Sequence, residues 1–65
     1  MTTTYVFGSD HFAIEESNGY FYVVDTDNNE NIHLFHSRQE CLDYLWEVAA
    51  TYIKFGFTCR EVVKG

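Results

Sequence analysis

At 65 residues the chain has room for one domain only, near the size at which a single hydrophobic core barely offsets conformational entropy. Ten Asp and Glu stand against four Lys and Arg, which gives a net charge of −6. A field of this sign repels nucleic acid and anionic lipid, and it attracts basic surfaces, including the grooves in which other proteins hold nucleic acid.

The composition indicates a folded protein with no membrane segment. Six Phe, five Tyr and one Trp, within a hydrophobic content of 46%, distinguish the chain from acidic disordered tails, which are poor in aromatic residues. The longest apolar run covers only residues 20–24, and the N-terminus has no basic segment followed by an apolar one. We therefore expect a cytoplasmic protein.

The first half of the chain predicts strands. Residues 12–16 alternate between apolar and polar, residues 17–19 (Ser-Asn-Gly) favour a tight turn, and residues 20–25 are rich in aromatic and β-branched side chains. A polar loop over residues 26–31 leads to a short strand at residues 32–35. Residues 5–7 fit either an extra edge strand or the lead-in to the first strand, and the sequence leaves both open.

The second half predicts one helix and a last strand. Ser37 and Glu40 match a capping box, in which Ser bonds the N–H three residues on and Glu reaches back to the Ser N–H. Apolar residues then recur at three- and four-residue spacing until Gly56, a suitable C-terminal cap: Cys41, Leu42, Leu45, Val48, Ala49, Tyr52 and Ile53. We expect a helix over residues 38–55 and a strand over residues 57–63.

The predicted fold is therefore α+β, one compact domain over residues 1–65 with an antiparallel sheet of about four strands (β-β-β-α-β) packed on one face by a single helix. Alternation separates Phe21 and Val23 from Tyr20 and Tyr22, and we expect the phenylalanine side to face the helix. Cys41 and Cys59 fall too far apart along the helix for a disulfide, so both are expected to be free thiols.

The acidic residues are the one group with chemical content. On the predicted helix Glu40, Asp43 and Glu47 fall on one side, opposite the apolar stripe, with no Lys or Arg four residues away from Asp43 or Glu47. No Lys or Arg precedes Arg38, and the strands and loops before it add further acids to the candidate contact set: Glu15, Glu16, Asp25, Asp27 and Glu30. These acids either keep the protein soluble or occupy the places of phosphates in a basic groove.

Other kinds of site find little support in the sequence. Neighbouring carboxylates on a strand point to opposite faces, and no nucleophile grouping or Gly-rich phosphate loop is present, so an enzyme is not expected. His33, His36 and Cys41 lack a fourth ligand for zinc, so no metal or cofactor is expected. Direct binding of nucleic acid needs a basic groove, which four scattered cations cannot form.

A short acidic chain with a sheet, one helix and no active site resembles the small anti-CRISPR proteins that phages encode. The resemblance implies an inhibitor in the bacterial host cytoplasm that blocks the DNA path of a CRISPR effector, with a type I Cascade favoured. The helix followed by residues 55–60 also looks like the end of small phage inhibitors of bacterial RNA polymerase. A third possibility is an assembly module that uses Tyr20 and Tyr22 as an interface, as a monomer or small homo-oligomer.

Overall fold

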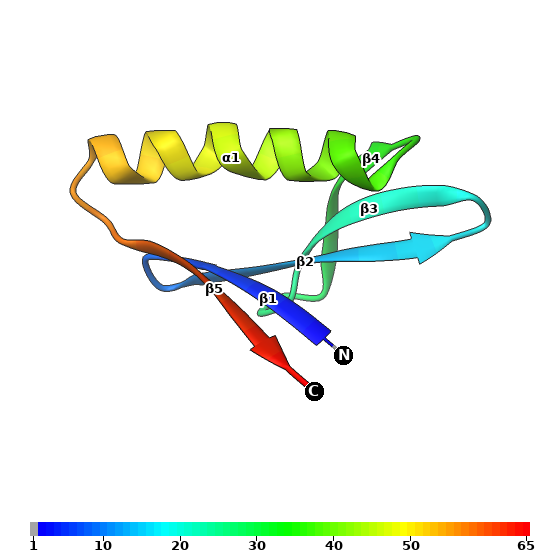
Figure 1. The fold of residues 1–65 in the computed structure, drawn as a ribbon, viewed down its shortest axis with the longest axis horizontal. Helices are drawn as coiled ribbons and strands as arrows, with labels where there is room; N and C mark the ends of the chain where they lie inside the picture. The colour runs from blue at the N-terminus through cyan, green and yellow to red at the C-terminus, as the bar shows by residue number, and fades with distance from the viewer. Residues whose placement is uncertain (1) are drawn as a thin grey trace.

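The computed structural model describes residues 2–65 as one antiparallel sheet and one helix (Figure 1). The elements are β1 (Thr2–Phe7), β2 (Asp10–Ser17), β3 (Tyr20–Asp25), β4 (Glu30–Phe35), α1 (Arg38–Lys54) and β5 (Cys59–Lys64). The strand order in the sheet is β4-β3-β2-β1-β5, and every neighbouring pair is antiparallel. The predicted α+β class with one helix is confirmed, and the sheet has five strands.

The additional strand is β1, and it lies inside the sheet. Tyr5 stands opposite Phe12 of β2 on one side and opposite Glu61 of β5 on the other. The segment is therefore neither an edge strand nor a lead-in, the two alternatives that the sequence left open. All of its last three residues are buried, as expected for a strand that is paired on both sides inside the sheet.

One predicted turn and one predicted helix cap have the expected geometry. Asn18 and Gly19 both have positive φ, 55° and 81°, the conformation of a two-residue hairpin loop that matches the strand twist. The helix ends in a Schellman motif, because the Gly56 N–H bonds Ile53 O and the Phe57 N–H bonds Tyr52 O. Gly56 has φ of +90°, which a residue with a side chain adopts only with strain.

The N-terminal cap differs from the predicted capping box in one bond. Ser37 Oγ accepts a hydrogen bond from the Glu40 N–H at 3.2 Å, as expected. The Glu40 carboxylate, however, accepts from the Ser37 hydroxyl at 3.1 Å instead of from the Ser37 backbone N–H. Both bonds still fix the first turn of α1.

We call the side of the sheet that packs against α1 the helix face and the other side the open face. Buried Cys41, Leu45 and Ala49 of α1 lie in the same core cluster as Val23, which has no exposed surface, and Phe21 packs against this cluster. The prediction that the phenylalanine side of β3 faces the helix is therefore confirmed. From β1 and β2 the cluster includes Tyr5, Phe7 and Phe12.

Two expectations at the end of the helix are wrong. Ile53, assigned to the apolar stripe, is 59% exposed because it lies on the same side of the helix as Trp46, seven residues earlier, and not on the side that faces the sheet. The last strand begins at Cys59 and not at residue 57. Phe57 instead packs edge-on against Tyr52, with ring centroids 5.8 Å apart. Both cysteines are free thiols, as predicted.

Candidate functional site

The carboxylate row, which we define as Glu40, Asp43 and Glu47, lies on the outer side of α1. All three residues are exposed. Glu40 is fixed by the helix cap described above, and Asp43 accepts a hydrogen bond from Gln39 Nε2 at 3.0 Å. Since the row is carried by a 17-residue helix with both ends capped, its Cα atoms are held at fixed spacing, roughly 4.5 to 6 Å of helix rise from one to the next.

The row borders a shallow hollow that aromatic side chains complete. The hollow has a volume of about 310 Å³, and the row shares it with His33 and Phe35 of β4 and with Tyr44 of α1. The His33 and Phe35 rings stack with centroids 4.4 Å apart and planes inclined by 11°, and Tyr44 lies 5.3 Å from the His33 ring. The structure therefore joins the predicted helix row to a rigid aromatic surface, which the sequence did not indicate.

Few of the charges are compensated within the chain. Over residues 2–65 the one close contact between a basic side chain and a carboxylate is the hydrogen bond between His11 Nδ1 and Asp27 Oδ2, at 3.1 Å. Within that range neither Lys nor Arg pairs with a carboxylate, so the acidic residues keep their full field toward solvent.

Two of the predicted contact residues on the first strands have structural roles. Asp25 Oδ1 accepts from the Asp27 N–H at 3.0 Å and from the Asn28 N–H, and its other oxygen accepts from the Asn28 amide. Asp25 thus closes the turn between β3 and β4, as Asp commonly does. Asp27, from the same turn, reaches back to His11 of β2.

The remaining acids do not form one surface with the carboxylate row. Glu15 stands opposite Tyr22 on the open face, whereas Glu16 stands opposite Phe21 at the β2–β3 hairpin end. Glu30 begins β4, opposite Asp25. The candidate contact set of the sequence therefore divides into the row on α1 and a dispersed group on the sheet.

Tyr20 and Tyr22 lie on the open face, as predicted for the side of β3 away from the helix. Tyr20 is 40% exposed and its ring contacts His36, with centroids 5.5 Å apart. Exposed Ile32 and Leu34 of β4 extend the apolar part of this face. No helix of the described residues covers it.

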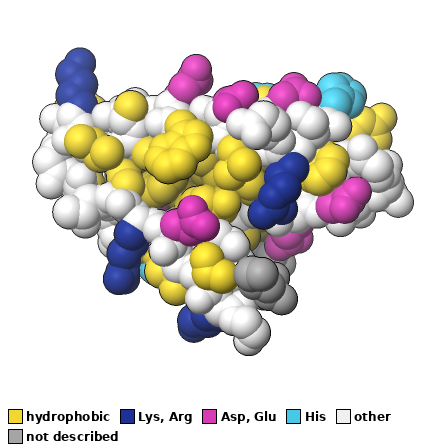
Figure 2. All heavy atoms as spheres, viewed as in Figure 1, with side chains coloured by type: hydrophobic (Ala, Val, Ile, Leu, Met, Phe, Trp, Pro, Cys, Tyr) yellow, Lys and Arg dark blue, Asp and Glu magenta, His cyan; other side chains and the backbone are white. Residues whose placement is uncertain are grey.

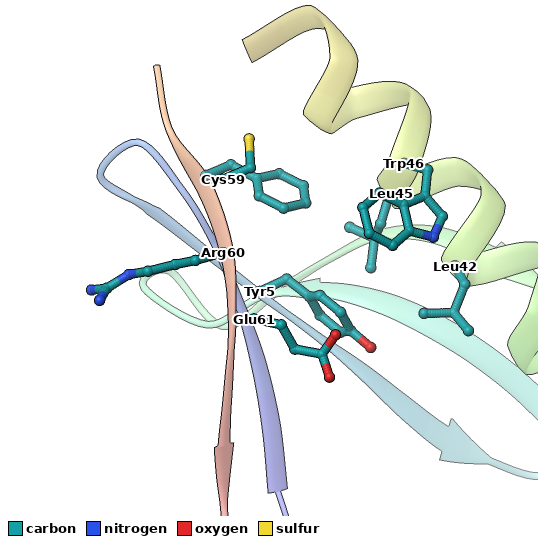
Figure 3. A pocket seen from close by; sticks show the side chains of 8 residues that line it. Tyr5, Leu42, Leu45, Trp46, Cys59, Arg60 and Glu61 are labelled. Atoms are coloured by element: carbon teal, nitrogen blue, oxygen red, sulfur yellow. The ribbon is translucent and has the colours of Figure 1, made fainter. Parts of the chain in front are cut away.

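Sequence reasoning missed a groove beside Trp46. The Trp46 groove is an apolar hollow of about 150 Å³ between α1, β1 and β5 (Figure 3). Its lining consists of Tyr5, Phe7, Leu42, Leu45, Trp46, Cys59, Arg60 and Glu61. The available signal was a second apolar line on the helix, Leu42, Trp46 and Ile53, next to the stripe that enters the core.

Charged groups surround the polar end of this groove. Burial and the nearby Glu61 carboxylate raise the pKa of Tyr5 above its ordinary value, and the Arg38 guanidinium opposes that shift. Figure 3 shows the Glu61 carboxylate beside the Tyr5 hydroxyl, with Trp46 and Leu42 on the opposite wall. The groove is thus apolar in its depth, and its rim carries the Glu61 carboxylate together with the cations Arg38 and Arg60.

Residues 2–65 hold no group of three or more His, Cys, Asp or Glu side chains arranged to bind a metal ion. Within the same range, α1 is too short and too polar to cross a membrane. Comparisons with protein families, with curated proteins and with solved structures found no match to this chain. The functional argument therefore depends on the surfaces described above.

Proposed function

We propose that this protein is an acidic inhibitor that binds the basic nucleic-acid groove of a bacterial effector complex and blocks binding of target DNA, with a type I CRISPR Cascade as the favoured target. The observation that carries the proposal is the carboxylate row, three exposed acids on one rigid helix without a Lys or Arg partner in the described part of the chain.

The physical basis is preorganisation of negative charge. A helix that is already formed pays no further backbone ordering cost when its carboxylates meet the Lys and Arg side chains of a DNA groove, so only the side chains must be ordered. Uncompensated charge also steers the encounter with a basic partner and speeds association. The dispersed acids on the sheet, such as Glu15 and Glu30, add to this long-range field without sharing the contact surface.

The target is identified by assay, because a DNA channel in RNA polymerase offers the same basic chemistry. Purified Cascade with its guide RNA, or RNA polymerase, is mixed with a labelled target duplex and increasing amounts of the protein. Binding of the duplex is measured by its mobility in a gel. Direct inhibition of one complex, weakened steeply as salt is added, is the expected result.

Charge reversal tests the role of the row. Asp43→Lys with Glu47→Lys should weaken inhibition at least about tenfold, because it puts cations against a basic groove. Glu15→Lys with Glu30→Lys is the matched control, since it changes the net charge equally but on the sheet, away from the row. This control should retain inhibition within about threefold, the scale of exposed charges outside a contact.

Circular dichroism of each variant verifies folding before inhibition is compared. Full potency of the folded row variant, or an equal loss in both variants, would contradict the proposal that the row is the contact surface.

The second candidate function, an assembly module, is favoured by the uncovered open face with exposed Tyr20. In that case Tyr22→Ser would break an oligomer seen by sedimentation, and charge reversal would have little effect.

A further inference from the structure

The outer edge of β5 presents backbone groups that no strand of the described residues uses. β5 is the last strand in the sheet order and pairs only with β1, Thr2 opposite Lys64 through Phe7 opposite Cys59. Next to this ladder, the Gly8 N–H donates to Thr58 O at 2.8 Å. Since bonded pairs alternate in an antiparallel ladder, the N–H and C=O groups of residues 60, 62 and 64 point toward β1, and those of residues 59, 61 and 63 point outward.

The residues with outward backbone groups carry their side chains on the helix face. Cys59 and Glu61 line the Trp46 groove, and Val63 follows them along the same side of the strand. In an added strand, each residue bonded directly opposite one of these positions would place its side chain on that same face. Backbone pairing at this edge would therefore direct guest side chains toward the groove.

The groove is suited to a single apolar side chain. Its volume is about 150 Å³, and an apolar protein cavity of this size accommodates a benzene ring. Trp46 stands at its margin with 66% of its surface exposed. Figure 2 shows hydrophobic side chains gathered over the helix and below it, on the face that contains the groove. An occupant would cover Trp46, which is otherwise costly to expose.

Charge decides between a second copy of the chain and a different partner. Two β5 strands paired about a two-fold axis through Glu61 would set two carboxylates opposite each other, and an axis through Val62 would set Arg60 opposite Lys64. An axis through Val63 opposes no like charges but pairs only residues 61–65. Both copies also carry a net charge of −6. A segment with a Lys or Arg opposite Glu61 meets a carboxylate on the helix face, whereas Arg60 and Lys64 of β5 carry their side chains on the open face.

We propose that β5 accepts an extended segment of another protein as a sixth strand, with an apolar side chain in the Trp46 groove opposite Cys59 and a Lys or Arg opposite Glu61. The recognition motif is then an apolar and a basic residue two positions apart, with main-chain bonds supplying affinity and the groove supplying specificity. This surface is separate from the carboxylate row, and its test does not depend on the proposed function.

Trp46 is the one tryptophan of the chain, so its fluorescence reports on the groove directly. The probes are nine-residue peptides with alternating Thr, in which the position opposite Cys59 is Phe, Ile or Ala and the position opposite Glu61 is Lys, Gln or Glu. Titration with the Phe–Lys and Ile–Lys peptides should shift the Trp46 emission to shorter wavelength and protect it from acrylamide. The Ala peptide should bind at least about tenfold more weakly.

Two matched changes separate strand addition from general attraction to an acidic protein. N-methylation of one outward-bonding peptide amide should weaken binding at least about tenfold, since it removes a ladder bond without changing charge. Glu61→Lys should reverse the preference, so that the Glu peptide binds about threefold to tenfold better than the Lys peptide. Glu15→Lys, on the open face, changes net charge equally and should leave the Lys preference intact.

The proposal is overturned by any of three results. These are no emission shift with either Lys peptide, equal binding of the N-methylated peptide, or equal effects of Glu61→Lys and Glu15→Lys. A shift of Trp46 emission with protein concentration alone, together with dimer formation in sedimentation, would instead assign the groove to a second copy.

Discussion

Tyr52 is the residue that links α1 to the sheet by a polar bond as well as by packing. Its hydroxyl donates to Asp10 Oδ2 at 2.5 Å, from the last turn of the helix to the first residue of β2. Its ring also contacts Phe7 and Phe57, with centroids 5.7 and 5.8 Å away. The bond to Asp10, followed by burial, raises the pKa of Tyr52 to about 12.

Tyr52→Phe should lower the free energy of unfolding by about 1.5 kcal/mol, because it removes a hydrogen bond to a charged group and keeps the ring contacts. Urea unfolding followed by circular dichroism measures the change. Asp10→Asn, which keeps an acceptor but removes its charge, is the control and should cost less. Equal stability of Tyr52→Phe and the parent protein would show that the bond contributes nothing.

The same bond predicts a pH dependence at high pH. The folded-state pKa of about 12 lies above the ordinary tyrosine value of 10.0, so the bond stabilises the folded protein fully below pH 10. This contribution is lost as pH rises from about 10 to 12, because the unfolded chain ionises first. Ultraviolet absorbance should show one phenol ionising near pH 12, and Tyr52→Phe should remove that step.

At the level of elements, the turns between strands and after the helix set the register. Gly8, with φ of +62°, makes the β1–β2 turn and lies directly under the Phe57 ring. A Cβ at this position would come within 2.9 Å of Phe57 Cδ1. Gly56 has a similar backbone requirement, φ of +90°, but open space around it. Substitutions at the two glycines therefore distinguish the cost of backbone strain from the cost of a side-chain collision.

Gly8→Ala should destabilise the protein by about 2–4 kcal/mol, the sum of left-handed backbone strain and collision with Phe57. Gly56→Ala should cost only about 1–2 kcal/mol, since the backbone strain acts alone. Thermal unfolding of both variants measures the difference. If Gly56→Ala were the more damaging change, the contact between Gly8 and Phe57 would have no energetic role.

The apolar surface of helix α1 is wider than the part that the sheet covers. Cys41, Leu45 and Ala49 enter the core, whereas Trp46 and Ile53 extend the apolar surface toward the β5 side and stay exposed. The carboxylate row occupies the remaining side, next to His33 of β4. One helix therefore carries a core face, an apolar margin and an acidic margin, and both proposed contact surfaces depend on its orientation over the sheet.

At the level of the whole molecule, repulsion between like charges opposes folding. The net charge is −6, and over residues 2–65 the one close contact between a basic side chain and a carboxylate involves His11 and Asp27, both substantially exposed. An exposed pair of this kind contributes little. The two ends of the chain lie side by side, since Thr2 and Lys64 stand opposite each other at one corner of the sheet (Figure 1).

Raising NaCl from about 10 to about 200 mM should therefore stabilise the protein, by about 0.5 kcal/mol or roughly 2–4 °C in melting temperature. The reason is that salt screens more repulsion than attraction in this chain. Differential scanning calorimetry at both salt concentrations checks the sign. A fall in melting temperature would contradict this prediction, because it would mean that attraction between opposite charges outweighs repulsion between like charges.

The sequence by itself determined the local structure: the β2–β3 hairpin with its Asn18-Gly19 turn, the cap at Ser37, the span of the helix and the carboxylate row. Each of these follows from residues close together in the chain, through turn chemistry, capping and the 3.6-residue period. Alternation reduced the side of β3 that faces the helix to two choices, and the structure confirms the expected one, which contains Phe21 and Val23.

Only the tertiary structure decided the place of β1, the separation of the acids and the Trp46 groove. β1 pairs with β5 across almost the whole chain, Thr2 with Lys64, and no local pattern encodes a partner so distant. Glu15 and the carboxylate row are both acidic in sequence, but the sheet places them on opposite sides. The groove exists because Trp46 of the helix and Cys59 of the last strand meet over Tyr5 of the first, and such convergence is a property of packing.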